Sequence, residues 1–192
     1  MSAKIITIAI EKGGTGKTVT ASNLAYLMGD EGKKVLCVDT DPQGNLTKAL
    51  SGGLSITSDE FYGKALYNLF DGFLYHSKTR DFIVETQYEN VDMIPCDAQT
   101  PRINKRIELL IGDAERLKDG DPRKVSGMGD FLCYFLNQVR DEYDYILIDT
   151  QPTRDSLLLS NAIYAADYIL IPAGCEDNSE ESAFRFIMNA IR

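Results

Sequence analysis

The hydrophobic pattern divides the chain into short apolar runs separated by longer segments of mixed polarity. The first run, residues 4–10 (KIITIAI), is rich in β-branched residues and almost entirely apolar, as expected of a strand buried on both faces of a parallel sheet. The same reasoning predicts strands over residues 35–38 (VLCV), 91–94, 145–148 (YILI) and 168–171.

The segments between these strands carry helical patterns. Residues 17–30 are predicted to form a helix with Leu24, Leu27 and Met28 on one face, and Gly32 is well placed to end it. Further helices are expected over residues 64–70, 103–117, 130–140, 155–165 and 180–192. The segment 118–129 (KDGDPRKVSGMG) is rich in turn-forming residues and is predicted to be a connection.

Alternating strands and helices predict an α/β fold with a doubly wound, mostly parallel sheet that carries helices on both faces. No repeat or linker divides the chain, so residues 1–192 are expected to form a single domain. Ligands of such sheets bind beyond the carboxyl ends of the strands. That edge is where the loop after Ile10, the pair Asp39 and Asp41, and Asp149 are expected.

Composition narrows the class of protein. The chain has 192 residues, of which 44% are hydrophobic and 26% charged, and its net charge of -9 argues against a broad basic surface. No apolar run approaches the roughly 20 residues of a membrane helix, so a cytoplasmic protein without membrane attachment is expected. The four cysteines form no CxxC pair and are expected to be reduced thiols.

A glycine-rich loop follows the first predicted strand and opens the first predicted helix. Its residues are Gly13, Gly14, Thr15, Gly16, Lys17, Thr18 and Val19. Backbone N–H groups of such a loop wrap a phosphate, the lysine neutralises phosphate oxygens, and the threonine hydroxyl ligates Mg²⁺. The usual pattern G-x-x-x-x-G-K-[ST] is not met, because position 11 is Glu. The alternative is an ordinary glycine turn before a helix.

Three aspartates accompany this loop. Asp149 follows an apolar strand, as a magnesium-binding aspartate does, and is predicted to hold Mg²⁺ together with Thr18 and Asp39. Asp39 and Asp41 frame the turn VDTDPQGN, and Asp41 is a candidate for orienting the attacking water. The competing interpretations are a strand-end cap for Asp149 and a turn residue for Asp41.

Lys12 is a second lysine in a loop that needs only one for phosphate. It is either a solvated lysine or a residue that reaches phosphates held by a second subunit, as an arginine finger supplied in trans does. The loop alone does not decide between these two roles.

Three segments resemble the ParA/MinD superfamily of deviant Walker A ATPases, a SIMIBI branch of the P-loop proteins. KGGTGKT resembles its phosphate loop, with Lys12 at the signature lysine; VLCVDTDPQGN is similar to the second motif of the ParA/Soj type; and residues 143–172 resemble the region around the magnesium-binding aspartate. The resemblance runs from about residue 4 to residue 192.

The resemblance implies an ATPase that uses Mg²⁺ and forms an ATP-sandwich dimer in which Lys12 contacts the partner's phosphates. It places Lys12, Lys17 and Asp41 in catalysis. It also implies a role in plasmid or chromosome partition. Proteins of this family bind DNA non-specifically, associate with the nucleoid and act with a ParB-type centromere-binding partner. Members of the family continue for several tens of residues past this end, with much of the adenine pocket and basic DNA-binding residues. DNA binding is therefore not expected of residues 1–192 themselves.

Other functions remain open from the sequence. A MinD-like membrane-cycling regulator would use residues 180–192 as an amphipathic helix, with Phe184, Ile187 and Met188 on one face. An iron–sulfur protein that shares the phosphate loop would use Cys96 and Cys133. A nucleotide-dependent assembly module with little hydrolysis is the non-enzymatic alternative.

Overall fold

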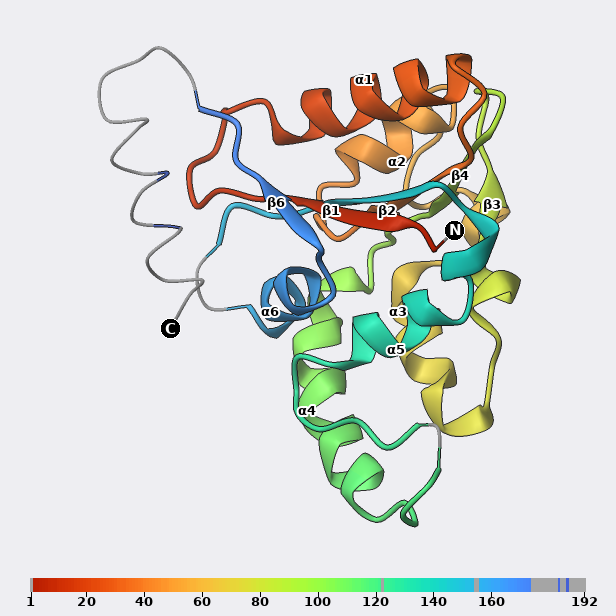
Figure 1. The fold of residues 1–192 in the computed structure, drawn as a ribbon, viewed down its shortest axis with the longest axis vertical. Helices are drawn as coiled ribbons and strands as arrows, with labels where there is room; N and C mark the ends of the chain where they lie inside the picture. The colour runs from red at the N-terminus through yellow and green to blue at the C-terminus, as the bar shows by residue number, and fades with distance from the viewer. Residues whose placement is uncertain (1, 122, 154–155, 174–182, 184–185, 187–192) are drawn as a thin grey trace.

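The computed structural model describes residues 2–121, 123–153, 156–173, 183 and 186. A six-stranded sheet crosses the molecule in the order β3-β4-β2-β5-β1-β6 (Figure 1). Its strands are β1 (Lys4–Ile8), β2 (Val35–Asp39), β3 (Val84–Glu85), β4 (Val91–Ile94), β5 (Tyr145–Asp149) and β6 (Tyr168–Leu170). All pairs are parallel except β3 with β4, so the predicted α/β fold with a mostly parallel sheet is confirmed.

Helices lie on both faces of the sheet. Figure 1 shows α1 (Lys17–Asp30) and α2 (Asn45–Leu50) above it, and α3 (Leu66–Asp71), α4 (Ile103–Glu115), α5 (Phe131–Asn137) and α6 (Leu157–Tyr164) below it. Short 3₁₀ turns join these elements at Asp59–Phe61, Gly72–Tyr75, Thr79–Phe82, Thr100–Arg102 and Arg140–Glu142. None of the described helices is long and apolar enough to cross a membrane.

The register aligns the ends of the three central strands. Asp149, the last residue of β5, pairs with Ile8 of β1 on one side and with Asp39 of β2 on the other. Two carboxylates and the start of the phosphate loop therefore meet at one edge of the sheet, as expected for parallel strands.

The face of α1 that packs on the sheet differs in part from the prediction. Leu24 and Met28 pack partly buried against the core as expected, but Leu27 is 56% exposed, and the fully buried positions along the helix beyond Lys17 are Ala21, Ala25 and Gly29. A Cβ on Gly29 would lie 2.7 Å from the carbonyl oxygen of Glu89, so only small side chains fit against the sheet here. The prediction followed the largest apolar residues, but the close approach of helix and sheet selects the smallest ones.

The opposite face of the sheet has an aromatic core. Phe73 packs edge-to-face on Phe131, Tyr134 and Phe135, with ring centroids 5.1, 5.4 and 6.0 Å away. Phe70 packs on Phe135 in the same way at 5.3 Å. These contacts join α3 and the turn after it to α5, which explains why the apolar run FLCYFL is helical and buried.

The helix predicted over residues 17–30 and the strand predicted over residues 91–94 have the predicted ends, and the remaining predicted elements within the described residues are found with ends shifted by one to three residues. The prediction omitted α2, the edge strand β3 and the 3₁₀ turns, all of which are six residues or shorter. The helix predicted over residues 180–192 lies almost entirely outside the described residues.

Candidate nucleotide site

The loop between β1 and α1 has the geometry of a phosphate cradle. Gly14 and Gly16 adopt φ values of +74° and +84°, which favour glycine, and Gly16 directly precedes the first residue of α1. The first amides of α1 and the positive end of its dipole consequently face the same space as the loop.

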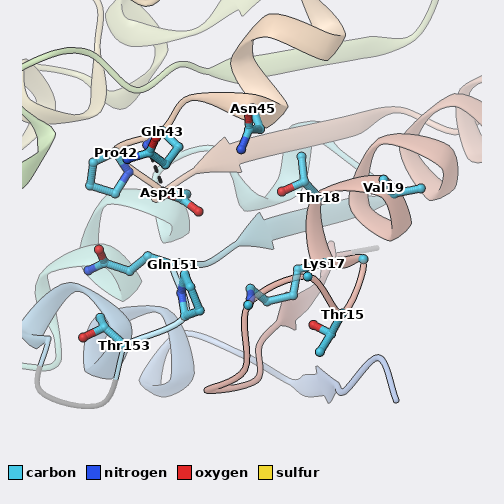
Figure 2. A pocket seen from close by; sticks show the side chains of 14 residues that line it. Thr15, Lys17, Thr18, Val19, Asp41, Pro42, Gln43, Asn45, Gln151 and Thr153 are labelled. Carbon is cyan, nitrogen blue, oxygen red and sulfur yellow. Dashed lines mark hydrogen bonds between the residues drawn. The ribbon is translucent and has the colours of Figure 1, made fainter. Parts of the chain in front are cut away.

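A cavity of about 550 Å³ opens beside this loop (Figure 2). It is lined by loop residues and by residues that follow β2 and β5: Gly13, Gly14, Thr15, Gly16, Lys17, Thr18, Val19, Asp41, Pro42, Gln43, Asn45, Gln151, Pro152 and Thr153. The structure thus brings together the predicted residues from Gly13 to Val19 and Asp41, whereas the predicted Lys12 is not among the lining residues. Their ligand-binding roles remain predictions.

Lys17 is held at the base of the cavity. Its side chain is buried, and Nζ donates a hydrogen bond to the carbonyl oxygen of Lys12 at 3.3 Å. Burial lowers the pKa of Lys17, while the charges of Asp149 and Asp41 oppose that shift. A buried ammonium with a neutral hydrogen-bond acceptor is well suited to receive the negative charge of a phosphate.

The pair of Thr18 and Asp149 is the part of the site that most strongly indicates cation binding. The Thr18 hydroxyl donates to Asp149 Oδ2 at 2.7 Å, whereas Asp149 Oδ1 is buried and has no hydrogen-bond partner in the part of the chain that the structure describes. The pKa of Asp149 is raised to about 7, chiefly by burial and also by the charges of Asp39 and Asp41, whereas the hydrogen bond from Thr18 lowers it. A buried carboxylate oxygen without a partner is costly, and a bound cation would supply that partner.

Few protein side chains are placed to coordinate such a cation. Within the described ranges, no group of three or more His, Cys, Asp or Glu side chains is arranged to hold a metal ion. A cation next to Asp149 would therefore draw its other ligands from the Thr18 hydroxyl, water and phosphate oxygens, as Mg²⁺ does in nucleotide sites.

Asp39 lies at the same edge of the sheet, but its carboxylate accepts hydrogen bonds from the segment that follows it. Its Oδ1 accepts the amide of Asp41 at 3.1 Å, and its Oδ2 accepts the amide and the hydroxyl of Thr47 at 2.8 and 2.7 Å. Burial raises the pKa of Asp39 to about 6 even though these hydrogen bonds lower it. Asp39 is not among the residues that line the cavity, and its predicted magnesium role remains a prediction.

Asp41 projects from the end of β2 toward the P-loop side chains, as Figure 2 shows. Its Oδ1 accepts the amide of Gln43 at 2.9 Å, which is the dashed line in the figure. The position fits the predicted role in orienting a water molecule, because Asp41 faces the cavity across from Lys17.

Several lining residues were not predicted. Asn45 belongs to the short helix α2, and Gln151, Pro152 and Thr153 follow β5. Gln151 Nε2 donates to the Ser156 hydroxyl at 2.9 Å, which ties the loop after β5 to the start of α6. The motif VDTDPQGN contained the signal for Asn45, but nothing in the spacing indicated the loop after β5.

Lys12 is half-buried and is not among the residues that line the cavity. Its carbonyl oxygen accepts from the Thr15 hydroxyl and from Lys17 Nζ, both at 3.3 Å. The backbone of Lys12 therefore shapes the cradle, whereas its side chain does not contribute to the wall of the nucleotide cavity.

The three described cysteines are free thiols, as predicted for them. Cys96 is fully buried, and burial together with the charge of Asp39 raises its pKa, so the thiolate form needed for a metal ligand is disfavoured. Cys133 is half-buried on α5. These settings do not support the iron–sulfur alternative.

Comparison with known proteins assigns the chain to a family. A family model described as an AAA domain matches residues 3–191. The sporulation initiation inhibitor protein Soj of Bacillus subtilis is 34% identical over 189 residues, and the chromosome partitioning protein ParA of Myxococcus xanthus is 34% identical over 176 residues. The chain belongs to the ParA/Soj-type P-loop ATPase family.

A solved structure supports the same assignment. A putative plasmid partition protein of Borrelia burgdorferi, bound to AMPPNP, aligns with a TM-score of 0.76 and 28% identity over 98% of this chain and 69% of that chain. The matches with Soj and ParA cover 98% and 90% of this chain but only 65% and 53% of those proteins. The chain therefore spans about half to two thirds of the length of these ParA/Soj relatives.

Proposed function

We propose that this chain is an ATP-binding switch that uses Mg²⁺ and hydrolyses ATP to ADP and phosphate. The observation that carries the proposal is the buried Asp149 Oδ1, which has no hydrogen-bond partner among the described residues and belongs to the carboxylate that accepts from Thr18, at the end of the phosphate loop. Magnesium, when bound, neutralises phosphate charge and draws its protein ligands from Thr18 and Asp149.

The phosphate chain fits the loop and the start of α1. The backbone amides from Gly13 to Thr18 surround the phosphates, and Lys17 exchanges its hydrogen bond with the carbonyl of Lys12 for phosphate oxygens. Because Lys17 is buried, its charge acts in a medium of low dielectric and is worth more than in water.

Hydrolysis in this proposal depends on Asp41. The carboxylate orients a water molecule for attack on the terminal phosphate, since it faces the cavity and its position is set by hydrogen bonds within the loop. Positioning and charge stabilisation account for most of the acceleration in phosphoryl transfer.

ATP also drives dimerisation in this proposal. Support comes from the resemblance of KGGTGKT to the family's phosphate loop, in which the signature lysine contacts the partner's phosphates, and Lys12 is not among the residues that line the cavity of its own chain.

The biological role that fits this family is partition of plasmid or chromosome DNA with a ParB-type partner, in the cytoplasm at the nucleoid. Soj and ParA carry sporulation and chromosome-partitioning names, and this chain is similar to both over at least 90% of its length. The net charge of -9 indicates that residues 1–192 contribute little to binding of DNA.

The direct test is equilibrium binding of ATP with and without Mg²⁺, followed by single-turnover hydrolysis. Lys17→Ala is expected to weaken ATP binding by about 10- to 100-fold, since it removes charge-assisted hydrogen bonds to phosphate. Lys33→Ala, at an exposed lysine past the end of α1, is the matched control and should bind like the parent. Binding without hydrolysis would support the assembly module, and no binding would refute the proposal.

A further inference from the structure

The loop that carries Asp41 is fastened by a buried threonine. Thr47 is fully buried on α2, and its amide and hydroxyl both donate to Asp39 Oδ2, at 2.8 and 2.7 Å. The other oxygen of the same carboxylate, Oδ1, accepts the amide of Asp41 at 3.1 Å. One carboxylate therefore connects Thr47 to the backbone of Asp41.

Thr47 also contacts the end of a second strand. Its hydroxyl oxygen accepts the amide of Cys96 at 3.1 Å, just beyond the end of β4. The hydroxyl thus both donates and accepts, and it joins the ends of β2 and β4 beneath the loop. The same hydroxyl also lies 3.7 Å from Cys96 Sγ, which is a second contact between these two strand ends.

Asp39 takes the place of a helix cap for α2. The residue before the helix is Gly44, which has no side chain to accept an amide, and the carboxylate of Asp39 accepts the third amide of α2 instead. The start of α2, including the cavity residue Asn45, is therefore fixed to the end of β2 through the pair Asp39 and Thr47.

Packing restricts the loop from the other side. Gly44 has φ +65°, and a Cβ at this position would lie 2.0 Å from Ile56 Cγ2 and 3.0 Å from Cys96 Sγ. The end of the turn at Gly44 is consequently packed closely against Ile56 and Cys96, next to the hydrogen bonds of Thr47.

We infer that Thr47 is a positioning residue for hydrolysis: it holds Asp39, and through Asp39 it holds Asp41, in the orientation that activates water. The inference rests on the proposed ATPase function. Thr47 itself touches no nucleotide, because it is buried behind the loop and is not among the residues that line the cavity.

The test compares Thr47→Val, which keeps the shape but removes the hydroxyl, with Thr47→Ser, which restores it. Thr79→Val is the matched control, because Thr79 is equally buried and its hydroxyl donates to the carbonyl of Phe135 on the opposite face of the sheet. Single-turnover rate, ATP affinity and unfolding free energy are measured for each protein.

We expect Thr47→Val to lower the single-turnover rate by about 10- to 100-fold while ATP affinity changes by less than about 3-fold, because misplacement of a catalytic group affects the chemical step. Thr47→Ser should recover most of the rate, and Thr79→Val should keep it. A Thr47→Val protein that hydrolyses like the parent, or one whose rate is not recovered by Ser, overturns the inference.

A second measurement separates this inference from the proposed function. Hydrogen exchange by mass spectrometry reports on the amides of Asp41 and Gln43, which donate to Asp39 and Asp41. These amides should exchange faster in Thr47→Val than in the parent, Thr47→Ser or Thr79→Val, whether or not the parent hydrolyses ATP. Unchanged exchange refutes the positioning role, whereas a parent that binds no ATP refutes the proposed function alone.

Discussion

Replacement of Asp149 by Asn should stabilise the protein in the absence of ligands and abolish its response to magnesium. The carboxylate is fully buried, its Oδ1 has no hydrogen-bond partner among the residues that the structure describes, and its pKa is raised from 3.8 to about 7, chiefly by burial. The folded state thus keeps a proton on Asp149 at pH values where the unfolded state has lost it.

The sign and size of the effect follow from that difference. Because the folded pKa is raised, the stability of the wild-type protein falls as pH increases from about 4 to about 7 and stays low above that. A rise of about 3 pKa units corresponds to about 4 kcal/mol at pH 8. Asn removes the charge but introduces a buried amide donor, which lowers the gain in stability by about 1–3 kcal/mol. The expected net gain for Asp149→Asn at pH 8 is about 2 kcal/mol, or about 6 °C in Tm.

Urea unfolding at pH 5.5 and pH 8 measures the effect, with Asp30→Asn, at an exposed carboxylate, as the charge control. The wild-type protein should lose about 2 kcal/mol more than Asp149→Asn between the two pH values. ATP with Mg²⁺ at about 100 times its Kd should add about 2.7 kcal/mol to the wild type and little to the variant. A variant that is no more stable than the wild type at pH 8 would refute the reasoning about Oδ1.

Three further substitutions test the packing and the charge interactions of the fold. Gly29→Ala should lose about 1–3 kcal/mol in urea unfolding, since its Cβ meets the Glu89 carbonyl at 2.7 Å and overpacking exceeds the gain in helix propensity. Phe73→Ala should lose about 3–5 kcal/mol by the same assay and keep ATP affinity, because its three ring contacts lie on the far face of the sheet. Burial raises the pKa of Asp167, but its hydrogen bonds from the Ile5 amide and Arg140 lower it overall, so its contribution is present above pH 4 and is lost as pH falls through the lowered value. The stability difference between wild type and Asp167→Asn should therefore shrink between pH 7 and pH 3.

The sequence predicted the parts of the fold that depend on long apolar runs and on glycine chemistry. The central strands and the phosphate loop follow directly from KIITIAI, VLCV, YILI and KGGTGKT, because buried parallel strands and left-handed glycines leave clear local patterns. The aspartates after β2 and β5 were found for the same reason, since strand ends of a parallel sheet share one edge.

Tertiary contacts decided the rest. The buried stripe of α1 consists of Ala21, Ala25 and Gly29 because the helix lies close to the sheet, and helical spacing alone favours the larger Leu27. The role of Thr47 depends on where Asp39 and the amide of Cys96 lie, which is a contact between residues 49 positions apart. Short elements such as α2 and β3 carry too few residues for a periodic signal.

The central claim, an ATP-dependent switch built on this phosphate loop, is tested most directly by the solution mass of Asp41→Ala with ATP and Mg²⁺ and with ADP and Mg²⁺. Light scattering measures the mass, and slowed hydrolysis should preserve the ATP-bound state. We expect the mass to double with ATP only. The doubling should be lost when Lys12→Ala is added but not when Lys33→Ala is added. A monomer with either nucleotide, or a dimer that forms equally well with ADP, would contradict it.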